Sequence, residues 1–402
     1  MKKGFLSEFF VGIASKRLSA VEANALISNQ HEFNGTKPLK NLLGACECEA
    51  RRFKTHFIYL TDIEDETAVA DGEMSWYDSR ANQDHRSAEC RLYYPTTAVS
   101  ERAQEGDLLV IARRKDESLL SLITKQASTI DQQVRWLFGL EESEQPGFSF
   151  HSEDEADKIE LNLPAKFLLE HIGVEVPESN DYYLDEMLAK FEGKFPNTKK
   201  FSTYARQTLP DIQSVDDPDS ALLAWWEREE ILFKTLERKL IEDRLKDGLN
   251  PDSFLEFSLS IHQRRKSRAG DALENHVEQV FLDHEINYSR EKYTEKKSKP
   301  DFIFPGIDRY RDAAFPCAKL SMLGVKSTCK DRWRQVLSEA KRIEEKHLLT
   351  LEPGISENQT EEMRDSKVRL VVPRFIHSTF TPEQQSWLMS VDNFVSFVRG
   401  KE

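Results

Sequence analysis

The stretch that decides the fold reads KPDFIFP at residues 299–305 and LGVKSTCKDRWR at residues 323–334, and it ends near Glu339. Asp301 begins one short run of strand-forming residues, and Lys326 ends the next. If the two runs pair in a sheet, the carboxylate of Asp301 and the ammonium of Lys326 come together. This is the layout of a metal-dependent phosphodiesterase site.

The residue types at this place fit phosphodiester hydrolysis. The reaction needs an activated water and a place for negative charge, and Mg²⁺ supplies both while taking oxygen ligands, typically one or two carboxylates. Asp301 is the natural first ligand, and Lys326 is expected near the scissile phosphate. Pro-Asp, an interval and then acid-x-Lys is typical of the PD-(D/E)xK nuclease superfamily, but here Gly324 replaces the acid. We therefore expect the second carboxylate from Glu339, on a helix beginning near Asp331.

The order of the expected elements favours the same site. A helix with Glu274 precedes the two strands, and the helix with Glu339 is followed by apolar runs at residues 346–351 and 368–373. Before them, Asp217-Pro218 predicts the start of a long helix that ends near residue 245. A central sheet flanked by helices is predicted.

Two polar clusters are candidates for DNA contact. The first, Lys330-Asp331-Arg332-Trp333-Arg334, offers donors to guanine and an acceptor for the amino group of cytosine, although a capping Asp beside surface cations is an ordinary alternative. The second, Arg264-Arg265-Lys266-Ser267-Arg268, is expected just before a helix. An exposed loop is possible there, but we favour phosphate contacts.

The N-terminal part is expected to be mainly β. Apolar runs at residues 53–60, 90–94 and 107–112 predict strands of a small barrel or sandwich. Between them, residues 16–35 and 76–86 are rich in Arg, Lys, Asn, Gln and His, the side chains that contact base edges. Such a composition more often marks a solvated loop.

The length of 402 residues suggests two domains, and the charge is unevenly distributed along them. The net charge of −14 argues against a nucleic-acid partner, but residues 141–200 hold 15 acidic and 6 basic residues, whereas residues 261–350 hold 19 basic and 14 acidic ones. A basic surface is thus expected in the C-terminal half.

The compartment is expected to be the cytoplasm, with no membrane association. No apolar run approaches the roughly 20 residues that cross a bilayer. The five cysteines form no C-x-x-C unit, so we expect reduced thiols rather than a zinc site or a disulfide framework.

Together the motifs resemble the EcoRII-type restriction endonucleases. The resemblance is carried by residues 264–270, by Lys299-Pro300-Asp301-Phe302, by Val325-Lys326 with residues 328–335, and by residues 368–373. It implies an α/β catalytic domain of restriction-endonuclease-like fold at residues 196–402, with a mixed central sheet flanked by helices. It also implies a linker at 179–195 and, at 1–178, a mainly β DNA-binding pseudobarrel that resembles plant transcription factors.

The resemblance further implies a homodimeric, Mg²⁺-dependent enzyme that cuts double-stranded DNA at a palindromic site related to CCWGG. Asp301, Lys326 and Glu339 would form the catalytic centre, with Tyr310 and Glu274 nearby and Mg²⁺ on Asp301 and Glu339. The N-terminal domain would bind a second, allosteric effector site. The residues expected to contact DNA are Lys330, Asp331, Arg332, Arg334, Arg264, Arg265, Lys266, Arg268, Lys16, His31, Arg80, Arg86 and Arg91.

Two other functions are compatible with parts of the sequence. A DNA-binding regulator with an inactive nuclease fold is disfavoured by the joint presence of Asp301, Lys326 and Glu339. A repair nuclease of the same superfamily without sequence specificity is disfavoured by the base-reading side chains at residues 330–332.

Overall fold

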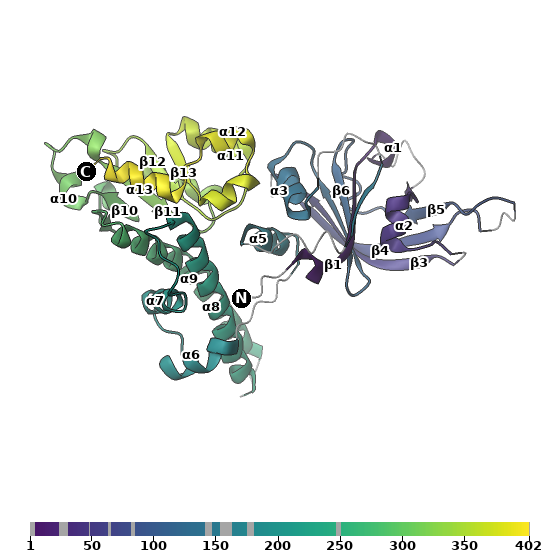
Figure 1. Ribbon diagram of the computed structural model, residues 1–402, viewed down its shortest axis with the longest axis horizontal. Helices are drawn as coiled ribbons and strands as arrows, with labels where there is room; N and C mark the ends of the chain where they lie inside the picture. The colour runs from purple at the N-terminus through teal and green to yellow at the C-terminus, as the bar shows by residue number, and fades with distance from the viewer. Residues whose placement is uncertain are drawn as a thin grey trace. The chain divides into compact units, whose positions relative to one another are not determined.

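The computed structural model describes residues 5–23, 31–47, 49–62, 66–81, 85–140, 147–152, 163–174, 181–246 and 251–401. The chain divides into two compact units, Met1–Val174 and Glu175–Glu402 (Figure 1). The predicted domain boundaries, 1–178 and 196–402 with a linker between them, stay a proposal.

The first unit is built around one eight-stranded sheet, in the order β2-β5-β4-β3-β7-β6-β1-β8. Neighbouring strands are antiparallel except β3 and β7. The runs expected as strands correspond to β3, β5 and β6, so the prediction of a mainly β unit is confirmed. The strands are β1 (Phe10–Arg17), β2 (Glu32–Asn34), β3 (Arg51–Leu60), β4 (Ala68–Asp78), β5 (Cys90–Tyr93), β6 (Leu108–Arg114), β7 (Leu119–Thr124) and β8 (Ser149–Ser152).

Short helices accompany this sheet, and their ends follow local sequence signals. In α3, the Ser128 hydroxyl accepts a hydrogen bond from the amide of Asp131 at 3.1 Å, and Gly139 ends the helix at a φ of 62°. A serine cap and a left-handed glycine satisfy the free backbone groups at the two ends. The helices are α1 (Ala20–Ala23), α2 (Lys37–Leu43), α3 (Thr129–Phe138) and α5 (Leu163–His171).

The cysteines of the first unit correct the prediction of reduced thiols. Cys46 and Cys90 form a disulfide that joins the segment after α2 to the start of β5. They are 44 residues apart, and only the pairing of strands between them brings them together. Cys317 and Cys329 are free, and Cys48 lies outside the described residues.

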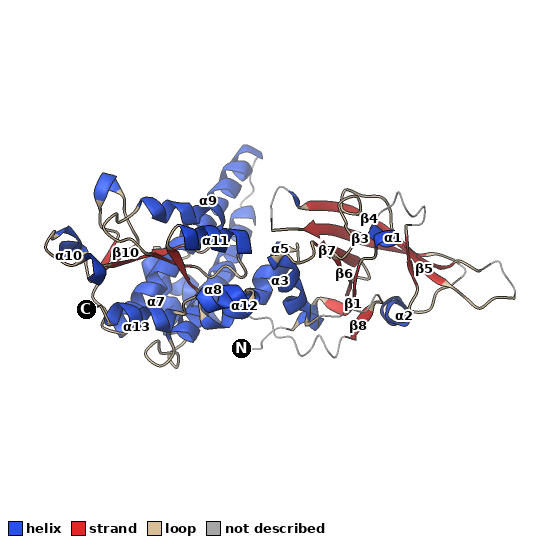
Figure 2. Cartoon of the chain, turned by 90° about the horizontal axis from the view of Figure 1, so that it is seen from above, coloured by secondary structure: helices blue, strands red, loops and turns tan. Residues whose placement is uncertain are grey.

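The second unit contains a mixed five-stranded sheet, in the order β13-β12-β11-β10-β9. Figure 2 shows β10 of this sheet among the helices of the unit. β9, β10 and β11 are antiparallel neighbours, whereas β11, β12 and β13 run parallel. The predicted mixed sheet flanked by helices is confirmed. The strands are β9 (Ser289–Arg290), β10 (Phe302–Phe304), β11 (Ser321–Val325), β12 (Lys346–Leu349) and β13 (Val368–Val371).

Two long helices, α8 and α9, dominate the helical part of this unit. α8 begins at Pro218, as predicted, whereas α9 corrects a prediction, because the basic cluster at residues 264–268 lies inside it rather than before a helix. α6 falls in the range expected as a linker, and its Met187 is buried with side chains of α7 and α8. The helices are α6 (Leu184–Lys190), α7 (Thr198–Gln207), α8 (Pro218–Lys246), α9 (Pro251–Asp283), α10 (Ile307–Arg311), α11 (Glu357–Asp365), α12 (Pro382–Trp387) and α13 (Val391–Arg399).

The two faces of the second sheet are covered by different segments. The ring of Phe281 in α9 lies 5.2 Å from that of Phe302 in β10 and 6.2 Å from that of Phe394 in α13, so α9 and α13 cover one face. A 3-10 helix, η6 (Lys330–Ser338), places Val336 against the other. No helix among the described residues is long and apolar enough to cross a membrane.

Candidate active site

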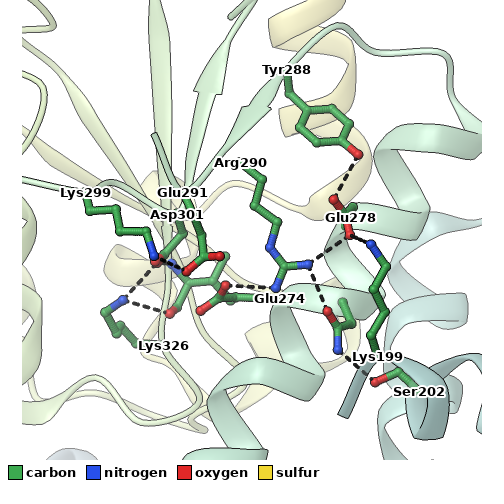
Figure 3. Close-up of polar contacts among 12 residues, drawn as sticks. Lys199, Ser202, Glu274, Glu278, Tyr288, Arg290, Glu291, Lys299, Asp301 and Lys326 are labelled. Atoms are coloured by element: carbon green, nitrogen blue, oxygen red, sulfur yellow. Dashed lines mark hydrogen bonds and ion pairs between the residues drawn. The ribbon is translucent and has the colours of Figure 1, made fainter. Parts of the chain in front are cut away.

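The site begins with Asp301 and Lys326, which meet at one edge of the sheet (Figure 3). Asp301 directly precedes β10 and Lys326 directly follows β11, and these strands are antiparallel. Lys326 Nζ donates to Asp301 Oδ2 at 2.8 Å, and the amide of Val325 donates to the same oxygen at 2.7 Å. The predicted meeting of carboxylate and ammonium is confirmed.

Two further carboxylates, Glu274 and Glu339, share the electrostatic field of Asp301. Burial, and then the charge of Asp301, raise the pKa of each to about 7. Lys326 acts on both in the opposite direction, and Arg290 does so on Glu274. The site therefore concentrates acidic groups around few cations, an arrangement that attracts a metal ion.

Glu339 reaches the site by a route that differs from the predicted α-helix. It directly follows the 3-10 helix η6, in which residues three apart lie on one face. Trp333 and Val336, at this spacing before Glu339, are 2% and 0% exposed. The spacing therefore directs Glu339 inward with these two side chains.

Gly324 explains why the usual acid before the lysine is absent. A Cβ atom on Gly324 would lie 2.7 Å from Val336 Cγ1 and 3.4 Å from Leu348 Cδ1, closer to Val336 than packed atoms allow. The bare backbone at this position thus lets η6 lie directly on β11. The same contact brings Glu339 to the site.

The donor set fits a divalent cation of the magnesium type. Glu339 Oε2 is buried and makes no hydrogen bond with the residues that the structure describes. In the described part of the chain, no three His, Cys, Asp or Glu side chains are close enough to bind a metal by themselves. Mg²⁺ commonly uses only one or two carboxylates and completes its shell with waters and substrate phosphate.

Tyr310, expected near the catalytic centre, makes its polar contacts elsewhere. Its hydroxyl donates to both carboxylate oxygens of Glu295 at 2.7 Å and accepts from the amide of Arg342 at 3.3 Å. Burial and Glu295 raise the pKa of Tyr310 to about 12. These contacts hold Tyr310 of α10 against the segment that follows η6, and its role near the catalytic centre stays a prediction.

Two cations of the basic cluster on α9, Arg265 and Arg268, pair with acids of α8. Arg265 Nη2 lies 2.6 Å from Glu237 Oε2. Arg268 is 7% exposed, pairs with Glu229 and Glu230 and lies 4.1 Å from the ring centre of Phe233. It therefore joins two helices and presents no charge at the surface.

The remaining cations of this cluster and of η6 have different environments. Arg264 is exposed and lies over the ring of Phe195, Arg332 is exposed, and Arg334 pairs with Glu362 at 2.5 Å. Arg332 thus stands at the surface of the segment that leads to Glu339. The side chains of three further candidates lie outside the described part of the chain: Lys266, Lys330 and Asp331.

The candidate DNA contacts of the first unit are mostly engaged within it. Lys16 is 9% exposed and lies 2.7 Å from Glu22, and the ring of His31 stacks edge-on against Tyr94. Arg80 and Arg91 both pair with Glu89. Arg86 is exposed.

Arg290 was not predicted from the sequence, yet it contacts three side chains of α9 beside the site (Figure 3). It lies in the two-residue strand β9, which is too short to show an alternating pattern. The sequence therefore holds no signal that sets this arginine apart.

Part of the chain matches a known protein family, and a longer part is similar to a characterised enzyme. Residues 233–395 match the family described as EcoRII C terminal. Over 263 residues the chain is 36% identical to the type II restriction enzyme EcoRII of Escherichia coli, an alignment that covers 62% of this chain and 64% of the relative.

Solved structures give weaker similarity. The complex of restriction endonuclease PspGI with its substrate DNA is 16% identical at a TM-score of 0.44, and it covers 51% of this chain and 94% of PspGI. The complex of metal-depleted Ecl18kI with uncleaved DNA is 18% identical at a TM-score of 0.43, and the match covers 55% of this chain and 84% of Ecl18kI. Residues 233–395 thus match the EcoRII C-terminal family, and the chain is similar in sequence to a type II restriction enzyme over 64% of that relative's length.

Proposed function

We propose that the chain is a sequence-specific type II restriction endonuclease that hydrolyses phosphodiester bonds of double-stranded DNA. The observation that carries the proposal is the contact between Asp301 and Lys326 at the edge of the second sheet, beside Glu274 and Glu339. These residues lie within the range that matches the EcoRII C-terminal family. The alignment spans 64% of the relative's length, so the activity of the whole protein belongs to this proposal.

In the proposed mechanism, Asp301 and Glu339 would hold Mg²⁺. The metal, when bound, activates a water and stabilises negative charge on phosphoryl oxygens. Lys326 lies 2.8 Å from Asp301, where its ammonium orients the attacking water or stabilises charge that develops on the phosphate. The amide of Val325 fixes the Asp301 carboxylate, so the acid needs little reorganisation before it binds the cation.

Sequence recognition is proposed for the segment between Lys326 and Glu339. Lys330, Asp331 and Arg332 would read C·G pairs of a site related to CCWGG, and Arg334 would lie at its border. A palindromic site requires a two-fold arrangement, so the enzyme is proposed to act as a homodimer. The exposed Arg264 remains a candidate phosphate contact.

The first unit is proposed to bind a second DNA site as an allosteric effector. Arg86 is the most accessible of its candidate contacts, whereas contacts by Lys16, Arg80 or Arg91 would compete with their present acidic partners. His31 is half-buried and its ring contacts Tyr94, so we propose that it contacts a base edge only through the exposed part of its ring.

The decisive experiment is digestion of a plasmid of known sequence with purified protein and Mg²⁺, followed by mapping of the ends. Lys326→Ala is expected to lower the cleavage rate by at least about 100-fold, since it removes the ammonium beside Asp301, while DNA affinity stays within about threefold. Lys292→Ala, an exposed lysine of the same unit, is the matched control. Undiminished cutting by Lys326→Ala would remove the site assignment.

A further inference from the structure

Arg290 links helix α9 to the edge of the sheet that carries Asp301. Its Nη1 donates to Asn275 Oδ1 and to Glu278 Oε2, each at 2.8 Å, and its Nη2 donates to Glu274 Oε2 at 3.1 Å (Figure 3). The arginine side chain is only 18% exposed. One guanidinium thus holds three polar groups of consecutive turns of α9.

The position of Arg290 is fixed relative to Asp301 by the backbone. Arg290 is paired with Phe302, the residue after Asp301, in the antiparallel β9–β10 ladder. The amide of Glu291, the next residue, donates to the carbonyl of Asp301 at 2.9 Å. Any side chain that Arg290 holds is therefore held at a defined place relative to Asp301.

Glu274 needs such a partner, because the charge of Asp301 repels it. Lys326 donates its hydrogen bonds to Asp301 and to the carbonyl of Val325. Among the residues that the structure describes, the cation that hydrogen-bonds Glu274 is Arg290. Without this contact a half-buried glutamate beside a second carboxylate would turn away or take up a proton.

The guanidinium is itself held from its far side. The Tyr288 hydroxyl donates to Glu278 at 3.2 Å, Lys199 Nζ donates to the same carboxylate at 3.4 Å, and the Asn275 amide donates to Ser202 at 3.2 Å (Figure 3). These contacts tie α7 into the same network. Arg290 therefore has little freedom to leave Glu274.

We infer that Arg290 is a positioning residue that holds Glu274 toward Asp301, so that the Glu274 carboxylate places its negative charge, through a bound water, beside the divalent cation. Arg290 acts through Glu274 and does not touch the substrate. The inference rests on the proposed function, since it assumes a metal-dependent reaction at Asp301.

The test compares Arg290→Gln with Lys299→Gln. Lys299 is a matched control because its positive charge also acts on Glu274, yet its ammonium pairs with Glu291 at 2.6 Å and is 42% exposed, so its loss removes charge without removing the contact that holds Glu274. Loss of a group that orients a metal ligand typically costs about 10- to 100-fold in metal affinity or activity. We expect Arg290→Gln to weaken Mn²⁺ binding to DNA-free protein by about 10-fold, measured by electron paramagnetic resonance, whereas Lys299→Gln changes it less than about threefold.

Cleavage kinetics supply the second measurement. In single turnovers Arg290→Gln is expected to raise the Mg²⁺ concentration for half-maximal rate by about 10-fold, with metal-free DNA affinity unchanged within about twofold. Arg290→Lys, which keeps the charge but loses the fork of donors, is expected to recover part of the loss. If Arg290→Gln does not fold, as judged by its Tm, this lysine variant must itself show the weakened metal binding.

A double-mutant cycle separates positioning from general support of the fold. In a Glu274→Gln background, Arg290→Gln is expected to add less than about twofold, because the residue through which it acts is already altered. Full multiplicative losses, or wild-type metal binding in Arg290→Gln, would overturn the inference. If the wild-type protein cuts no DNA, the proposed function is rejected, while the comparison of Mn²⁺ binding still decides the role of Arg290. If the wild-type protein binds no Mn²⁺, both the proposed function and the role of Arg290 are rejected.

Discussion

Glu274 and Glu339 set the pH range in which cleavage is expected. The pKa of each is raised to about 7 by burial and by Asp301, so both are largely protonated at pH 6 and ionised at pH 8. Only the ionised carboxylates attract the cation. We therefore expect the single-turnover rate to rise with pH through about 7 and to level off above about 8. A flat profile between pH 6 and pH 8 at fixed Mg²⁺ would contradict this.

Gly324 offers a test of the contact that brings η6 to the sheet. Adding one methyl group in Gly324→Ala places Cβ against Val336, so we expect a loss of about 1–3 kcal/mol in the free energy of unfolding from this overpacking. Gly270→Ala is the control, because a Cβ there meets open space within α9 and is expected to stabilise the helix by about 1 kcal/mol. Urea unfolding measures both, and equal changes would argue against tight packing at Gly324.

The residues of the site differ in how well sequence could reveal them. Asp301 and Lys326 were predictable because each lies at the end of a strand-forming run and antiparallel pairing leaves no other place for them. The hydrogen bond of Tyr310 with Glu295 was not predictable, since it depends on the path of α10. The contacts of Arg290 could not be predicted, because its three partners belong to a helix that ends before β9 begins.

At the scale of elements, Asp219 at the start of α8 connects three segments. Its fully buried carboxylate accepts hydrogen bonds from the amides of Arg374 and Val391 at 2.9 Å and of Asp392 at 3.1 Å. Asp219→Ala leaves buried donors without acceptors, so we expect a loss of roughly 3 kcal/mol in the free energy of unfolding. Asp392→Ala removes a 47% exposed carboxylate of the same cluster and is expected to cost less than about 1 kcal/mol.

Chemical denaturation of the two variants decides this prediction. A similar small loss for both would mean that the Asp219 hydrogen bonds add nothing beyond exposed charge pairs. Preserved Mn²⁺ binding in the Asp392 variant would show that the comparison concerns stability alone.

Element boundaries were predictable where local chemistry fixes them. The pair Asp217-Pro218 predicted the start of α8 correctly, because proline is favoured at the first position of a helix. The basic cluster was misplaced because Gly270 follows it in the sequence, yet α9 continues through this glycine. The partners of the cluster, Glu237 and Glu229, lie in α8, so no local signal reports the pairing. The 3-10 form of η6 depends on its contact with β11, which no local signal reports.

At the scale of the whole molecule, the two units allow the effector proposal to be tested. Deleting residues 1–180 is expected to leave an endonuclease that cuts plasmids with one site as fast as plasmids with two, because the proposed allosteric unit is gone. The full chain serves as the control and is expected to prefer two sites by about 10-fold or more. A truncated protein that folds, as judged by circular dichroism, and still requires two sites would reject the effector role.

The mainly β and α/β character of the two units followed from hydrophobic patterning, but their long-range connections did not. The Cys46–Cys90 disulfide joins positions whose spacing carries no motif, and reduced thiols were the simpler prediction. The charge distribution was more informative than its sum, yet it did not reveal that Arg268 is buried in a pair with acids of α8 while Arg264 and Arg265 stay exposed.

The buried carboxylate of Asp219 also bears on synthesis of the protein. Its oxygen atoms accept hydrogen bonds from the amides of Arg374 and Val391, which lie 155 and 172 residues further along the chain. These oxygens therefore have no native partners while the ribosome is still synthesising the sheet. During that interval the start of α8 carries an unpaired acid that favours solvent over burial. The packing of α8 against the segments at Arg374 and Val391 is therefore expected to be completed only after Asp392 has emerged.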